Sequence, residues 1–181
     1  MIELTDNEKY LIRNGQQYLK DNDIKRFYQW LSQGRADENE KGHISTFFLE
    51  NGINVLEYFT SVPNYMFYGA DIESIDIPDN ITRIGKYAFK NCEKLQNVNL
   101  GNSLKSIETE AFSGCTSLRR IFLPDSLTIL GQNIFNKCSG GLVIMANKRT
   151  PANRLRCKQN ETPWYRKHLF VNDENAEGEN I

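Results

Sequence analysis

The side chains of this sequence that could do chemistry are few, and three of the four cysteines are the most regular among them. Cys92, Cys115 and Cys138 recur every 23 residues. If that step is a structural repeat, the thiols stand in line about 4.8 Å apart on neighbouring strands, which Cα spacing alone would permit for a disulfide. Side chains in such a line point in parallel into the core, where cysteine behaves as a small hydrophobe. A zinc site needs ligands that converge tetrahedrally, so we expect reduced, structural thiols.

The remaining reactive residues lend little support to catalysis or cofactor binding. Cys157 has no histidine or aspartate beside it, His43 falls in a charged stretch, and His168 is close to Phe170. The sequence shows no serine–histidine–aspartate grouping, glycine-rich phosphate loop or paired metal-ligand spacing. Residues that are distant in the sequence could still converge in the fold. The simplest prediction is a protein with no enzymatic activity, no metal and no cofactor.

The 23-residue step also relates several columns of similar apolar residues, and it organises the middle of the chain. These columns are Phe89, Phe112 and Phe135; Ile81, Leu104 and Leu127; Ile84, Ile107 and Leu130; and Ile75, Val98, Ile121 and Ile144. A constant period of this length is typical of solenoids, in which stacked units bury a continuous core. Each unit ends in an alternating segment, such as 95–100, that predicts a short strand. We therefore predict an α+β solenoid of about four rungs.

The first rung, at residues 64–78, is only a partial repeat. The 23-residue step places Met66 level with Phe89, and it places Gly69 at the position of the cysteine. Degenerate units are usual at the ends of repeat arrays, because a terminal unit has a neighbour on one side only.

At these repeated positions the chain resembles the BspA-like family of leucine-rich repeats. The residues that carry the resemblance are Ile84-Gly85, Ala88-Phe89, Cys92 and 95–100, then Ala111-Phe112, Cys115 and 118–124, and more loosely Leu130-Gly131, Phe135 and Cys138. The resemblance covers residues 63–146. It implies a short leucine-rich repeat array and, for function, only protein–protein recognition, because one fold can host many roles. It also suggests a bacterial or bacteriophage setting.

Many BspA-like proteins are secreted or displayed on the cell surface, and this chain departs from them at its start. Residues 1–8 lack the basic and then apolar layout of a signal peptide, although a chain trimmed of its signal would look the same. No window approaches the ~18 apolar residues of a membrane helix. The net charge of −1 gives the whole chain no bias toward polyanions. We expect a cytoplasmic protein with no membrane contact.

Residues 1–60 are predicted to form a helical N-terminal cap. Thr5 and Glu8 have the spacing of a capping box, which starts a helix expected to end near residue 20. Asp23 can cap a second helix, and Gly34 is placed to end it.

The rest of this segment is expected to be less regular. Residues 35–42 are interpreted as a charged linker, and Ser45 or Thr46 as the start of a third, short helix. The segment has two possible roles. It can shield the open edge of the first rung, or it can be a separate interaction head in which aromatics such as Tyr10 and Trp30 reach a partner.

The array is expected to span residues 61–146, followed by a mixed C-terminal cap at 147–170 and an acidic, disordered tail at 171–181. The predicted cap carries seven cations against one acidic residue. Nucleic-acid binding is therefore the main alternative function, with cations on phosphates and aromatic rings stacked on bases. The residues for this role are Lys148, Arg149, Arg154, Arg156, Lys158, Trp164, Arg166 and Lys167. Against it, no nucleic-acid motif is present, and the acidic tail could compete for the same cations.

The outward positions of the strands define the predicted partner-binding surface. Read by register, the outward columns are Asp76, Asn99, Phe122 and Met145; Ser74, Asn97, Arg120 and Val143; and, unless the strand curves inward at its start, Glu73, Gln96, Arg119 and Leu142. Arginine, aromatic and methionine side chains are enriched at interface centres. The predicted contact residues are Asn97, Asn99, Arg119, Arg120, Phe122 and Met145. The C-terminal cap, through Trp164 or Phe170, could instead fold over this edge and bury it.

We predict that the protein binds another protein and acts as an adaptor or as an inhibitor that covers its partner's surface. A phage-encoded inhibitor of a host complex is one concrete version. The strands alone offer about a dozen outward residues, whereas a standard interface uses ~20–30 residues on each side. At least one cap is therefore expected to contribute to the contact, or the protein to form homo-oligomers.

Overall fold

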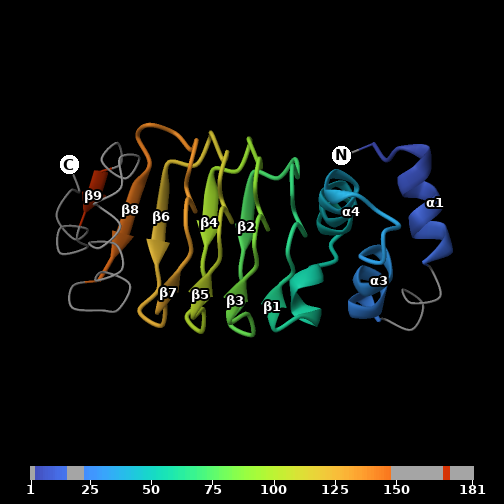
Figure 1. Cartoon of the computed structure of the whole chain (residues 1–181), viewed down its shortest axis with the longest axis horizontal. Helices are drawn as coiled ribbons and strands as arrows, with labels where there is room; N and C mark the ends of the chain where they lie inside the picture. Colours follow the sequence, from blue (N-terminus) through green and yellow to red (C-terminus); the bar gives the residue numbers. More distant parts are fainter. Residues whose placement is uncertain (1–2, 16–22, 148–168, 172–181) are drawn as a thin grey trace.

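The chain folds into an elongated stack of short strands with helices at one end. The computed structural model describes residues 3–15, 23–147 and 169–171 of the chain. Helices gather at the N-terminal end, and the strands lie side by side from there to β9 at the opposite end (Figure 1). The helical elements are α1 (Asp6–Asn14), α3 (Ile24–Leu31), α4 (Glu38–Glu50) and the short 3-10 helix η1 (Val55–Tyr58).

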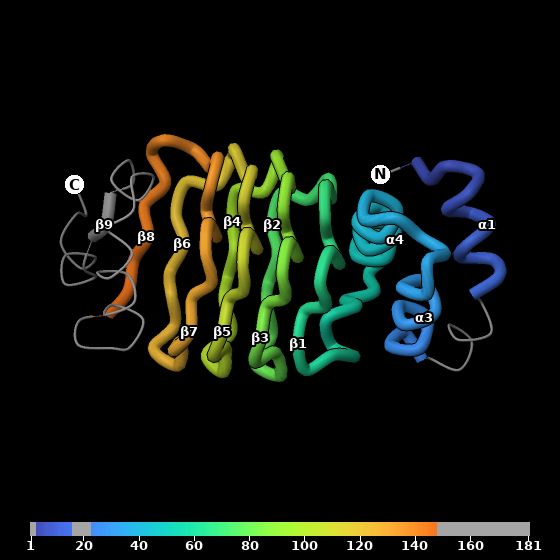
Figure 2. The backbone as a smooth tube through the Cα atoms, viewed as in Figure 1, coloured from blue at the N-terminus to red at the C-terminus, as the bar shows by residue number. Residues whose placement is uncertain are grey.

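Two rows of parallel strands build the array, and the backbone passes from one row to the other in every rung (Figure 2). The first row is β1 (Ser61–Val62), β3 (Arg83–Ile84), β5 (Ser106–Ile107) and β7 (Ile129–Leu130). The second row is β2 (Ser74–Asp76), β4 (Asn97–Asn99), β6 (Arg120–Leu123), β8 (Val143–Ala146) and β9 (Leu169–Val171). Ile84 pairs with Ile107 and Arg120 with Val143, so the predicted 23-residue solenoid is confirmed.

A ladder of phenylalanines forms the centre of the core, and the repeat predicts three of its members, Phe89, Phe112 and Phe135. Phe67, Phe89, Phe112 and Phe135 stack face to face, with successive ring centroids 5.0, 5.1 and 5.9 Å apart. All four rings are at most 1% exposed. Because each ring packs against those of its neighbouring rungs, the stability of one rung depends on the rungs beside it.

The cysteines form a second ladder beside the rings. The thiols of Cys92, Cys115 and Cys138 each donate a hydrogen bond to a phenylalanine carbonyl of the preceding rung, at 3.0, 3.2 and 3.0 Å. All three are free thiols; Cys92 and Cys115 are buried and Cys138 is half-buried. The hydrogen bond with the Cys115 thiol, and then burial, raise the pKa of Cys138 well above its usual range. The hydrogen bond with the Cys138 thiol lowers the pKa of Cys115. The contact of Cys115 with Cys92, and the burial of Cys115, outweigh this effect, so the pKa of Cys115 is raised overall.

These raised pKa values make the stability of the array fall at alkaline pH. A thiol whose pKa is raised by folding contributes fully below the pKa of the unfolded chain, about 8.5. Above that pH the unfolded chain ionises first, so the free energy of unfolding should drop by up to about 1.4 kcal/mol per pH unit for each such thiol. Urea unfolding at about pH 7.5 and about pH 9.5 measures this drop. In Cys115→Ala the decrease in the free energy of unfolding between these two pH values should be smaller. An unchanged decrease would show that groups other than the thiols cause it.

The first rung differs from the expected register by one residue. Phe67, rather than Met66, stacks beneath Phe89, and Ala70, rather than Gly69, precedes Cys92 in the cysteine column. The reason is that the first turn is one residue short. Ser61 pairs with Arg83, a step of 22, whereas Ser74 pairs with Asn97, a step of 23.

The first two helices begin where the sequence indicates. The amide of Thr5 donates to Glu8 Oε2 at 2.8 Å, and the amide of Glu8 donates back to Thr5 Oγ1 at 3.2 Å. Asp23 accepts from the amide of Arg26 at 3.0 Å and so caps α3. Helix α1 ends at Asn14, and the expected continuation toward residue 20 falls on residues 16–22, which lie outside the described part of the chain.

The prediction of a charged linker at 35–42 is wrong, because α4 already begins at Glu38. Asp37 and Glu40 form a second capping box, with their reciprocal bonds at 2.9 and 2.8 Å. Ser45 and Thr46, expected to start a helix, are buried in its middle, where each hydroxyl bonds the carbonyl four residues before it. Three of the charged residues assigned to the linker, Glu38, Glu40 and Lys41, form the first turn of the helix.

Helix α4 closes the open end of the array, as a cap requires. Its Gly42 lies so close to the first rung that a Cβ there would be 2.0 Å from the carbonyl oxygen of Tyr68. The hydroxyl of Ser45 bonds the carbonyl of Met66 at 2.7 Å and the buried phenol of Tyr28 at 2.6 Å. These bonds join α3, α4 and the first rung, and one continuous hydrophobic core runs through all of them. The helical segment is therefore packed as a cap.

Candidate protein-binding surface

The second row of strands presents its outer side chains on one surface, which we call the strand face. Side chains alternate along a strand, so the inward positions build the core: Ile75, Val98, Ile121 and Ile144 are all buried. The strand face consists of the outward strand residues Ser74, Asp76, Asn97, Asn99, Arg120, Phe122, Val143 and Met145, together with the exposed residues just before three of the strands, Glu73, Gln96 and Arg119.

The structure brings the predicted contact residues together on this face. Asn97, Asn99, Arg119 and Arg120 are exposed, and Phe122 and Met145 are partly exposed. The last two are partners in the register of β6 and β8 and so lie side by side. Strand β9 extends the sheet beyond β8 and pairs with it in parallel, while Met145 keeps part of its surface.

Leu142 is not part of the strand face, contrary to the column that included it. Its side chain is fully buried, whereas Glu73, Gln96 and Arg119 at equivalent positions are exposed. The chain enters β8 through a turn, in which the amide of Leu142 donates to the carbonyl of Ser139. An apolar side chain at this point gains more from the core than from solvent, so it turns inward.

Charge is unevenly distributed over the strand face. The first rung contributes Glu73 and Asp76, and the carboxylate of Asp76 accepts a 2.6 Å hydrogen bond from the side-chain Nδ2 of Asn99. The third rung contributes Arg119 and Arg120, and the Arg119 guanidinium contacts the hydroxyl of Ser139. Within the described residues neither arginine pairs with a carboxylate, so both keep their charge available to a partner.

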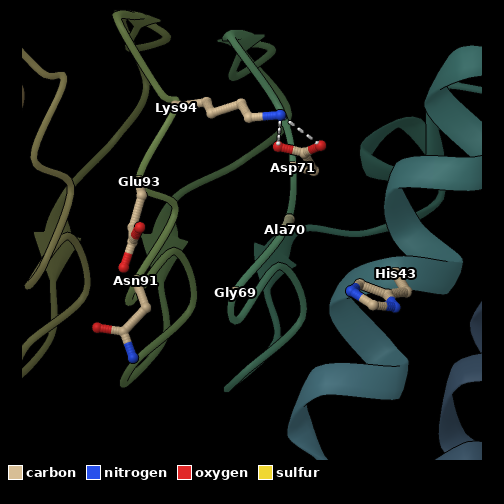
Figure 3. Close-up of a pocket in the computed structure, with 7 residues that line it drawn as sticks. All are labelled: His43, Gly69, Ala70, Asp71, Asn91, Glu93 and Lys94. Carbon is tan, nitrogen blue, oxygen red and sulfur yellow. Dashed lines mark hydrogen bonds and ion pairs between the residues drawn. The ribbon is translucent and has the colours of Figure 1, made fainter. Parts of the chain in front are cut away.

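Two clefts lie where α4 meets the first two rungs, and both are lined by Asp71 and Lys94. Lys94 reaches across to Asp71, with its ammonium 2.8 Å from the carboxylate (Figure 3). The first cleft, of about 460 Å³, is lined by His43 of α4, Asn91 and Glu93 among others. The imidazole Nδ1 of that histidine lies 2.9 Å from the buried carboxylate of Glu8 in α1. Both helices thus orient the ring that lines the cleft.

The second cleft joins the helical cap to the strand face. Its volume is about 440 Å³, and its lining includes Glu50 of α4 together with Glu73 and Ser74 of the strand face. Sequence reasoning missed both clefts, although one signal was available. Asp71 and Lys94 are 23 residues apart, so opposite charges occupy the same position on neighbouring rungs.

Other predicted sites fall outside what the structure describes or find no counterpart in it. The eight residues of the nucleic-acid alternative, from Lys148 to Lys167, lie outside the described residues. Among the side chains that are described, no group of three or more histidine, cysteine, aspartate or glutamate residues is arranged to hold a metal ion. None of the described helices has the length and apolar character that crossing a membrane requires.

A capped stack of short parallel strands, built on a leucine- and isoleucine-rich repeat, defines a leucine-rich repeat protein. Residues 60–148 match the BspA type leucine rich repeat region in six copies. Over these residues the chain carries the repeats of this family. The resemblance seen in the sequence is therefore confirmed, and leucine-rich repeats of this type suggest a protein–protein interaction module.

Several solved bacterial structures are similar to part of the chain. A leucine-rich repeat protein from Bacteroides ovatus is 31% identical over 50% of this chain and 26% of its own, with a TM-score of 0.42. A leucine rich cell surface protein from Faecalibacterium prausnitzii is 30% identical over 42% of this chain and 20% of its own, with a TM-score of 0.40. The pneumococcal vaccine antigen PcpA is 29% identical over 44% of this chain and 20% of its own, with a TM-score of 0.41. The chain thus spans about a quarter or less of these proteins. No curated protein matches it.

Proposed function

We propose that this protein binds another protein through the strand face and acts as an adaptor or inhibitor by covering its partner's surface. The observation that carries the proposal is the cluster at the third and fourth rungs. Phe122 and Met145 lie side by side, and the exposed Arg119 and Arg120 flank them. Arginine, aromatic and methionine side chains are the residues that interface centres concentrate. A scattered apolar residue needs no explanation, but this grouping of types favours a contact surface.

The area needed for a stable contact favours participation of the helical cap. The strand face alone offers fewer residues than the ~20–30 that a standard interface uses on each side. The second cleft continues from Glu73 and Ser74 onto Glu50 of α4. A partner that follows the strand face toward the first rung therefore reaches the cap without a break. The cap then serves both to close the array and to enlarge the contact.

The family suggests protein recognition, and the more specific role is our proposal. A small recognition surface with no catalytic group assigned to it acts by occupancy, so it either holds two proteins together or blocks one. We favour a bacterial or phage-encoded inhibitor of a host complex, acting in the cytoplasm. A second copy of this chain and a nucleic acid are the competing partners, and the experiment below separates them.

The strand face is tested by a double variant with a matched control. Phe122→Asp with Arg120→Glu should reduce capture of the protein partner at least ~30-fold, because removal of central aromatic and arginine contacts costs about 2 kcal/mol or more. The control makes matching changes at the first row of strands, as Ile129→Asp with Lys105→Glu. Ile129 of β7 is 61% exposed, and Lys105 is exposed just before the neighbouring strand β5. The control should keep wild-type capture.

The measurement is affinity capture from bacterial lysate with and without nuclease, read by quantitative mass spectrometry. A nuclease-resistant protein that is lost only with the strand-face variant supports the proposal. Capture that vanishes with nuclease moves the function to the basic segment at 148–167. Recovery of this chain alone, with a doubled mass on size exclusion, makes the partner a second copy. Equal capture by the two double variants overturns the strand-face proposal.

A further inference from the structure

The charges of the strand face follow a fixed order along the solenoid. The first rung presents the acidic Glu73 and Asp76, the second the neutral amides Asn97 and Asn99, and the third the basic Arg119 and Arg120, all exposed. The partly exposed apolar pair, Phe122 and Met145, follows at the third and fourth rungs. The face therefore runs from anionic, through neutral, to cationic and apolar, beginning at the helical cap.

The acidic end keeps its charge, because Lys94 beside it is already bound to Asp71 at 2.8 Å. Among the described residues no cation forms an ion pair with Glu73 or Asp76. The cleft beside Lys94 leaves about 440 Å³ open next to Glu73. A long cationic side chain fits such a space, with its stem along the cleft and its charge at the carboxylates.

The spacing of the rungs sets the scale on which a partner must match this order. Neighbouring strands lie about 4.8 Å apart, so the acidic first rung and the basic third rung are separated by about 10 Å. This distance is close to the Debye length at physiological ionic strength, about 8 Å, so a partner senses the two ends as separate charges. An extended chain covers this distance in about three residues, and because its side chains alternate, residues about two or four positions apart face the same surface.

We infer that the partner binds through a charge-ordered protein segment, with a cationic residue over the first rung, an anionic residue about two or four positions further on, and an apolar residue over Phe122 and Met145. This inference rests on the proposed function and gives the chemistry of the partner's contact segment. Opposite charges meet at both ends only when the segment lies in one direction along the face. In the reverse direction like charges face each other, which electrostatic complementarity selects against.

The test uses two synthetic peptides of identical composition, coupled to beads so that many copies reinforce a weak contact. The ordered peptide carries lysines, a neutral spacer of about three residues, glutamates and then leucine and phenylalanine. The control peptide alternates the lysines and glutamates. The full chain at low salt should bind the ordered peptide about tenfold more than the control, a difference of about 1.4 kcal/mol by the usual conversion.

Charge reversal on the protein sharpens this test. Glu73→Lys and Asp76→Lys together with Arg119→Glu and Arg120→Glu, all at exposed positions, invert the order of the face, so the variant should lose the ordered peptide. It should bind instead a third peptide in which the glutamates and lysines change places and the apolar residues stay. The control variant Lys105→Glu with Ile129→Asp should bind as the wild type does.

The outcomes separate this inference from the proposed function. If the ordered and alternating peptides bind equally, or neither binds, the inferred segment is wrong. The strand face can still be the contact surface in that case, and loss of lysate capture with Phe122→Asp and Arg120→Glu would show it. Failure of that capture experiment, in turn, removes the proposed function whatever the peptides do.

Discussion

Replacing Phe112 by alanine should lower the free energy of unfolding by about 3–5 kcal/mol. Its ring is fully buried and stacks between those of Phe89 and Phe135, with centroids 5.1 and 5.9 Å away. Alanine would leave a cavity in the middle of the ladder, bounded by stiff strands that cannot collapse into it. Domains of this size are stable by only about 5–15 kcal/mol, so the loss removes a large share of the total.

Urea unfolding followed by circular dichroism measures this loss, and Tyr10→Ala is the matched control. Tyr10 is also aromatic but is 61% exposed on α1, so its replacement should change the free energy of unfolding by less than about 0.5 kcal/mol. Phe112→Leu should fall between the two, because it keeps most of the apolar volume. Equal effects of the two alanine substitutions would mean that the phenylalanine ladder does not hold the array together.

Gly42→Ala should destabilise the protein by about 1–3 kcal/mol, although alanine is the better helix former. In an exposed helix the same change would stabilise by about 0.5–1 kcal/mol. Here the new methyl group would lie 2.0 Å from the carbonyl oxygen of Tyr68, so α4 would have to move away from the first rung. The displacement would also disturb the bond between Ser45 and the Met66 carbonyl.

The same unfolding experiment tests this prediction, with Asn39→Ala as its control. Asn39 is exposed on α4, so alanine there should be neutral or slightly stabilising through its higher helix propensity. The two alanine substitutions on one helix should therefore have opposite signs. A stabilising Gly42→Ala would show that α4 does not pack on the array in solution.

The constant part of the repeat could be predicted from the sequence in detail. The 23-residue step places the phenylalanines and cysteines in their ladders and assigns which strand residues face inward, because side chains alternate strictly along a strand. The same argument failed at Met66 and Gly69, where the step is 22 residues. A period predicts register only while it is constant, and nothing local marks the missing residue.

Local signals in the helical cap predict where its helices begin, but not how the helices pack. The capping box at Thr5 and Glu8 is visible in the sequence, and the same spacing occurs at Asp37 and Glu40, where the surrounding charged residues are also typical of a linker. The burial of Ser45 could not be foreseen from its neighbours. It depends on Tyr28 and on the Met66 carbonyl, which come from other parts of the chain.

By itself, the sequence determined the family, the repeat and the order of charges along the strand face. The reason is that a fixed step brings equivalent positions onto one surface. Only the tertiary structure decided that α4 packs on the first rung, that Lys94 reaches Asp71, and that two clefts open beside this pair. These features depend on how a segment without the repeat docks onto the array, and its contacts join residues that no period relates.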